Sequence, residues 1–78
     1  MNETELLRLR EALDNANAVA TAAAAHYKVA AAAHYAGRGN YATYEDAAAN
    51  FSTAVAKLKA ARIAYDAARK AAGKQPAQ

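Results

Sequence analysis

The chain has 78 residues, a net charge of +3 and no cysteine, so it forms at most one domain without disulfide or zinc–thiolate crosslinks. Alanine occupies 27 positions and only 16 carry a larger hydrophobic residue, which favours helix but supplies little material for a core. A modest positive charge does not by itself indicate nucleic acid. The polar N-terminus lacks the pattern of a secretory signal, and the alanine-rich tract 18–36 is too weakly apolar for a membrane span. We therefore expect a cytoplasmic helical protein that gains stability from self-association or from a partner.

The first predicted helix covers residues 3–36. Asn2 and Glu5 have the spacing of a capping box, and neither glycine nor proline follows before Gly37. Apolar residues recur at alternating spacings of three and four, as the a and d positions of a heptad do. This ladder consists of Leu6, Leu9, Leu13, Ala16, Ala20, Ala23, Tyr27, Ala30 and His34. Gly37 suits the positive φ that often follows a helix, so residues 37–43 are the predicted turn.

The second predicted helix covers residues 44–72, with Thr43 as its N-cap and Asp46 completing the capping box. Its larger residues are spaced by seven, and alanine fills the positions between them. The ladder is Tyr44, Ala47, Phe51, Ala54, Leu58, Ala61, Tyr65, Ala68 and Ala72. Gly73 and Pro76 are expected to end the helix, which leaves residues 73–78 as a frayed tail.

Two such helices joined by a short turn predict an all-α fold, an antiparallel two-helix hairpin with an alanine-rich coiled-coil seam. Pairing residues whose numbers sum to 81 places Tyr27 opposite Ala54 and Ala23 opposite Leu58. Nearly every layer then contains one large residue and one alanine, which allows close approach of the backbones without voids.

Further apolar stripes lie outside this seam on both helices. They predict a homodimer in which two hairpins form a four-helix bundle. The predicted dimer face consists of Val19, His26, Val29, Ala56 and Ile63. The alternative is that an alanine-rich surface is simply tolerated in water.

The sequence offers no catalytic or metal-binding pattern. His26 and His34 are separated by eight residues, whereas two metal ligands on one helix face need a spacing of three or four. There is no nucleophile next to a base and no glycine-rich phosphate loop after a strand. We expect a protein that is not an enzyme and uses neither a cofactor nor a metal.

Two groups of residues are candidates for binding a partner. Tyrosine and arginine, which are enriched at binding hot spots, gather around the turn, and the predicted partner-binding tip is Tyr35, Arg38, Tyr41, His34 and Tyr44. The alternative is that these rings plug the end of the bundle. The second group, a possible phosphate-binding surface or simply solvated helix, is Lys57, Lys59, Arg62, Arg69 and Lys70.

The leading interpretation is a small protein–protein interaction module. Its size and composition suit a phage or mobile-element accessory protein that binds and inhibits a host protein. One alternative is a nucleic-acid-binding regulator that uses the basic half of the second helix. Another is a structural or assembly subunit.

Overall fold

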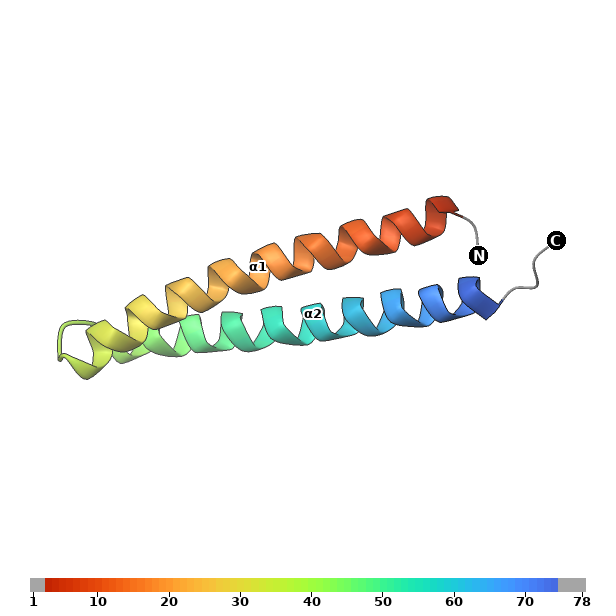
Figure 1. Cartoon of the computed structure of the whole chain (residues 1–78). Coiled ribbons are helices and arrows are strands. Elements are labelled where there is room, and N and C mark those ends of the chain that lie inside the picture. Colours follow the sequence, from red (N-terminus) through yellow and green to blue (C-terminus); the bar gives the residue numbers. More distant parts are fainter. Residues whose placement is uncertain (1–2, 75–78) are drawn as a thin grey trace.

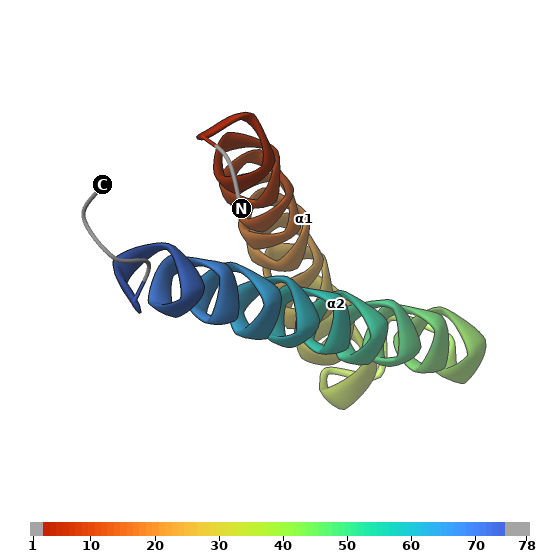
Figure 2. The ribbon, with the colours of Figure 1, turned by 90° about the vertical axis from the view of Figure 1, so that its right-hand side faces the viewer.

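The protein is an antiparallel helical hairpin, as predicted (Figure 1). The computed structural model describes residues 3–74 as two helices, α1 (Glu3–Tyr35) and α2 (Tyr41–Lys74). The helices lie side by side and cross at a shallow angle, as the two perpendicular views show (Figures 1 and 2). The molecule measures 64 × 14 × 13 Å, so it is a rod with the turn at one end and the N- and C-terminal ends of the helices at the other.

The turn is closed by a Schellman motif at the end of α1. Gly37 has φ of 75°, and its N–H donates to the carbonyl of His34 at 3.1 Å. The N–H of Arg38 donates to the carbonyl of Ala33 at 2.8 Å, which completes the motif. A Cβ atom on Gly39 would lie 3.1 Å from the Cβ of Ala33. The predicted role of Gly37 is confirmed, and Gly39 allows the chain to return close to α1.

The start of α2 differs from the prediction. The helix begins at Tyr41 rather than near residue 44, because Asn40 is its N-cap. The Oδ1 atom of Asn40 accepts a hydrogen bond from the N–H of Thr43 at 2.7 Å. Asparagine is among the strongest N-caps, and an earlier start adds most of a turn of backbone hydrogen bonds. Thr43 is therefore the third residue of the helix, and the predicted cap at Thr43 is wrong.

The other helix ends agree with the prediction in part. α1 begins at Glu3, as expected, while Asn2 lies outside the described residues. α2 continues through Gly73 to Lys74, so the first two residues of the predicted frayed tail are helical. The remainder of that tail, including Pro76, lies outside the described residues.

The predicted seam is the buried surface of the hairpin. Every ladder residue of both helices is buried or half-buried. The buried residues are all alanines: Ala20, Ala30, Ala47, Ala54 and Ala68. The larger ladder residues, such as Leu13, Phe51 and Tyr65, are only half-buried, because one neighbouring helix can cover just one side of a bulky side chain. The heptad assignment is confirmed, and the described core consists of methyl groups.

The register is shifted by one heptad from the predicted pairing. The ring of Tyr27 stacks on Tyr44 and on Phe51, with centroid distances of 5.8 and 5.6 Å, so Tyr27 is level with Ala47 rather than Ala54. Both registers pair a large residue with a small one in most layers, because the ladders repeat every seven positions. The turn decides between them. Because Asn40 caps α2, the turn is shorter than predicted and its middle lies near Gly37. Each residue of α1 therefore faces a residue of α2 that comes seven positions earlier than predicted.

Candidate functional site

A column of stacked aromatic rings fills the seam near the turn. In order away from the middle of the rod, the rings belong to Phe51, Tyr27, Tyr44 and His34, and they come alternately from α2 and α1. Neighbouring centroids are 5.6, 5.8 and 4.7 Å apart, with interplanar angles of 13°, 29° and 10°. Stacking at these distances is a favourable arrangement of aromatic rings. The column makes the turn end of the hairpin a place where large side chains support one another.

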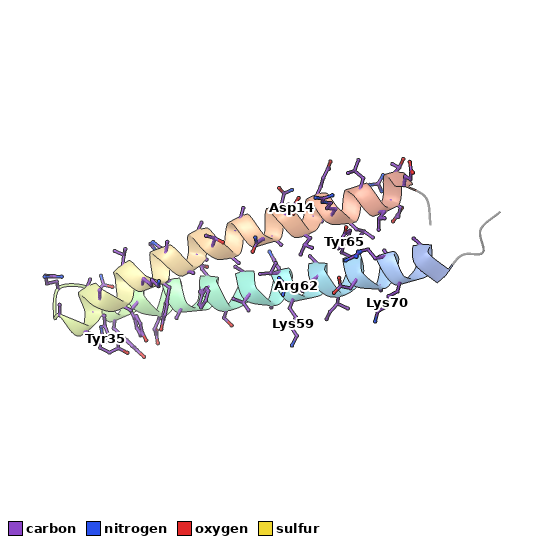
Figure 3. The ribbon with its side chains drawn as sticks, in the orientation of Figure 1. Asp14, Tyr35, Lys59, Arg62, Tyr65 and Lys70 are labelled. Atoms are coloured by element: carbon purple, nitrogen blue, oxygen red, sulfur yellow. The ribbon has the colours of Figure 1, made fainter. Side chains whose placement is uncertain are left out.

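Two further tyrosines flank this column. The ring of Tyr35 meets Tyr44 edge-on at 5.9 Å, and the ring of Tyr41 lies 5.6 Å from His34 and 6.2 Å from Tyr44. Tyr35 is 76% exposed and Tyr41 is 54% exposed. Figure 3 shows Tyr35 beside the turn, at the end of the rod. We call His34, Tyr35, Tyr41 and Tyr44 the tyrosine tip; its rings brace one another on one side and face water on the other.

The pKa values of two tip hydroxyls, those of Tyr41 and Tyr44, are raised by their neighbours. The Oη atom of Tyr44 lies 3.4 Å from the hydroxyls of both Tyr27 and Tyr35, which is long for O–H···O hydrogen bonds, so each is weak. These two hydroxyls raise the pKa of Tyr44 above its ordinary value. A hydrogen bond to Glu45, together with its negative charge, raises the pKa of Tyr41. Tyr41 and Tyr44 thus present hydroxyl groups that can donate or accept hydrogen bonds.

Arg38 does not belong to the ring cluster. Its backbone N–H is part of the Schellman motif, and the residue is exposed. Among the described residues, its guanidinium has no hydrogen-bond, ion-pair or ring partner. The predicted tip is thus assembled in four of its five residues, with Tyr44 and His34 at its centre, and Arg38 lies in the adjacent turn.

The five predicted phosphate-binding residues are all exposed but do not form one surface. Lys59 and Lys70 point away from α1 (Figure 3). Arg69 instead lies against the seam, with its guanidinium carbon 5.8 Å from the ring centroid of Tyr65. Lys59 and Arg69 therefore lie on different sides of α2, whereas Arg69 and Lys70 line one open hollow together with Asp66.

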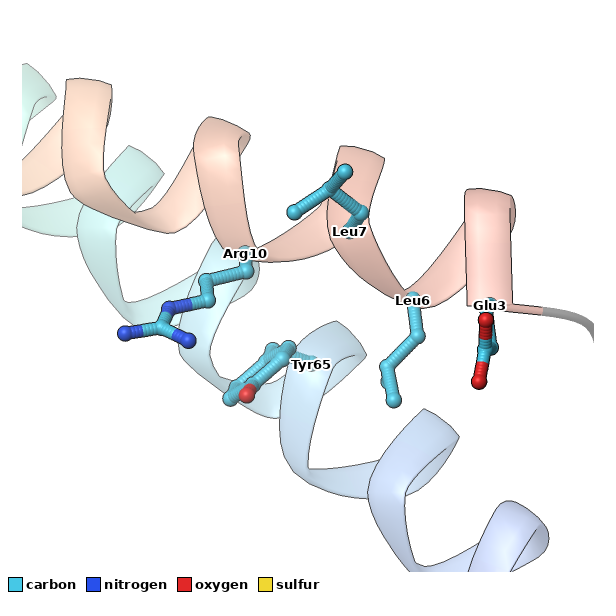
Figure 4. Close-up of a pocket in the computed structure, with 5 residues that line it drawn as sticks. All are labelled: Glu3, Leu6, Leu7, Arg10 and Tyr65. Atoms are coloured by element: carbon cyan, nitrogen blue, oxygen red, sulfur yellow. The ribbon is translucent and has the colours of Figure 1, made fainter.

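The sequence also associates Arg10 of α1 with the basic residues of α2. Arg10 lies beside Tyr65 in an open hollow of about 210 Å³, whose other lining residues are Glu3, Leu6 and Leu7 (Figure 4). In the close-up Tyr65 lies between Arg10 and Leu6, while Leu7 points away from α2. Arg10 directly follows the ladder residue Leu9, and Arg69 directly follows Ala68, so both flank the seam.

Comparison of the chain with protein-family models, with curated proteins and with solved structures gave no match. Within residues 3–74, no three His, Asp or Glu side chains come together in a group that could hold a metal ion. Over the same residues, neither helix is long and apolar enough to cross a membrane.

Proposed function

We propose that this protein is a small, non-enzymatic module that binds another protein through the tyrosine tip. The observation that carries the proposal is the exposure of Tyr35 and Tyr41, at 76% and 54%, on rings that are already held by their neighbours. Large aromatic side chains with a polar end are typical anchors of protein interfaces. A braced ring loses little conformational freedom on binding, so more of its contact energy contributes to affinity.

The tip also suggests what kind of surface the partner presents. The exposed ring faces favour an apolar depression, and the phenol groups favour carbonyl or carboxylate acceptors at its edge. Arg38, which is adjacent and unpaired among the described residues, favours a carboxylate. By occupying such a surface the protein would block or bridge its partner, and inhibition of a host protein by a phage or mobile-element accessory protein is one such role.

The test is affinity capture from the native host, followed by mass spectrometry. Wild type is compared with the double variant Tyr35→Ala/Tyr41→Ala and with Ile63→Ala, which removes a side chain that is 60% exposed but far from the tip. We expect the double variant to lose a protein that wild type and Ile63→Ala both retain, while circular dichroism shows unchanged helicity. Equal capture by all three chains would refute the assignment to the tip.

A second candidate function rests on the arginines around Tyr65. Arg69 over the ring and Arg10 beside it combine two cations with an aromatic face, a combination that binds the phosphates and bases of nucleic acids. Fluorescence anisotropy with mixed-sequence oligonucleotides would show binding that weakens steeply with salt and is reduced in Arg10→Ala/Arg69→Ala. The absence of binding at low salt would exclude this candidate.

A further inference from the structure

We infer that the hairpin associates with a second copy of itself through one side of α1, the valine face, which consists of Val19, Ala22, His26 and Val29. All four residues are exposed, and the two valines are 57% and 70% exposed. The inference does not depend on the tyrosine tip, since none of these residues contacts the ring cluster through an aromatic interaction among the described residues. Three further observations support it.

The first observation is the surface area. The chain exposes 5840 Å², whereas a compact monomer of 8.2 kDa exposes roughly 4500 Å². The rod therefore exposes about 1300 Å² more than a globular chain of its mass. A stable dimer of standard size buries roughly 800 Å² on each partner. The hairpin has enough surplus surface to form such an interface along part of its length.

The second observation is the distribution of charge. Between residues 15 and 36 the only charged side chain is Lys28, and residues 47–56 carry none. Helix surfaces that face water usually carry charged residues, and the centres of protein interfaces are depleted in them. A partner of opposite charge gains nothing from such a face, because the face carries no charge with which it could pair. It can meet a symmetry-related copy of itself without placing like charges together.

The third observation is the geometry of α1. Each valine-face residue precedes a ladder residue by one position: Val19 precedes Ala20, and His26 precedes Tyr27. One residue is a rotation of about 100° around a helix, so this second heptad stripe lies about a quarter turn from the seam. A helix in a four-helix bundle packs against two neighbours in this arrangement. The stripe is thus placed where a second hairpin would complete a bundle.

The same helix geometry excludes two residues, Ile63 and Ala56, from the predicted dimer face. Ile63 and Ala56 precede the ladder residues Tyr65 and Leu58 by two positions, a rotation of about 200°. They lie on the side of α2 that faces away from α1, and both are exposed. They do not share a face with Val19 and Val29, and Ile63 is therefore a matched control.

The test is the molar mass in solution, measured by sedimentation equilibrium from low micromolar to near-millimolar concentration. We expect wild type to reach twice the 8.2 kDa chain mass. Val29→Glu should weaken the dimer by at least roughly tenfold, whereas Ile63→Glu should leave it unchanged. A monomer at every concentration, or loss of the dimer in Ile63→Glu alone, would overturn the inference.

A crosslinking experiment locates the face even if Val29→Glu fails to fold. The chain has no cysteine, so Val19→Cys and Ile63→Cys each introduce a single thiol. If the valine face forms the interface, mild oxidation should give covalent dimers of the Val19→Cys chain several times faster than of the Ile63→Cys chain. Equal rates, or faster crosslinking of the Ile63→Cys chain, would place the contact elsewhere.

Discussion

At the scale of single residues, ionisation of the Tyr44 hydroxyl makes the free energy of unfolding depend on pH in the alkaline range. Its neighbours raise its pKa in the folded chain, while in the unfolded chain it ionises near its ordinary value of 10.0. As pH rises through about 10, the unfolded state loses this proton first, so the free energy of unfolding falls. We expect Tyr44→Phe to make that fall less steep in urea titrations between about pH 9 and 11. An absorbance titration in which all five tyrosines ionise together would contradict this.

Gly37 and Gly73 have opposite expected responses to alanine. Gly37 has φ of 75° and open space around the missing Cβ, so Gly37→Ala should destabilise by about 1–2 kcal/mol through backbone strain alone. Gly73 is helical and also has open space, so Gly73→Ala should stabilise by at most about 1 kcal/mol. Thermal melts followed by circular dichroism measure both. If both variants changed stability in the same direction, the turn would not be built as described.

At the scale of elements, the start of α2 depends on a single side chain. The Oδ1 atom of Asn40 accepts a hydrogen bond from the N–H of Thr43 at 2.7 Å, so Asn40→Ala should cost about 1 kcal/mol of stability. Thr43 is exposed inside the first turn, and Thr43→Ala should change stability by less than about 0.5 kcal/mol. Urea denaturation compares the two variants directly. A larger loss of stability for Thr43→Ala than for Asn40→Ala would show that Thr43 is the N-cap, as predicted from the sequence.

Close helix packing makes the seam intolerant of larger residues. Ala54 is 5% exposed, so Ala54→Leu should push the helices apart and cost about 1–3 kcal/mol. Ala49 is exposed on the same helix, and Ala49→Leu should be nearly neutral because both residues favour helix. Equal losses of stability in urea denaturation would show that Ala54 does not face α1.

The helices and the seam were predictable because each depends on local pattern. The heptad ladders specified which residues face the other helix, and Gly37 specified where α1 ends. The register was not predictable in the same way, because a seven-residue repeat fits its partner equally well after a shift of one heptad. The cap at Asn40, in place of the predicted cap at Thr43, decided the length of the turn and therefore the pairing.

The tip was predictable as a group of residues but not as an arrangement. Sequence proximity brought Tyr35, Tyr41 and Tyr44 together, and it suggested Arg38 as their centre. The ring column depends instead on contacts across the seam, such as Tyr27 with Tyr44 at 5.8 Å, which follow from the register. The placement of Arg10 next to Tyr65 was not predictable for the same reason, since 55 positions separate them in the chain.

At the scale of the whole molecule, a described core made only of alanines leaves little stability to the isolated hairpin. If a second copy covers the valine face, stability must depend on concentration by mass action. We expect the melting temperature to rise as protein concentration is increased a hundredfold, and to be insensitive to concentration in Val29→Glu. A wild-type melting temperature independent of concentration would mean that the hairpin is stable alone.

The shape of the rod has a practical consequence for anyone who handles the protein. α1 starts and α2 ends at the pole opposite the turn (Figure 1), on a molecule 64 Å long. A surface linker attached at the start of α1 or at the end of α2 would be separated from the tyrosine tip by most of this length. Tyr35 and Tyr41 would therefore remain accessible to a binding partner in biosensor measurements.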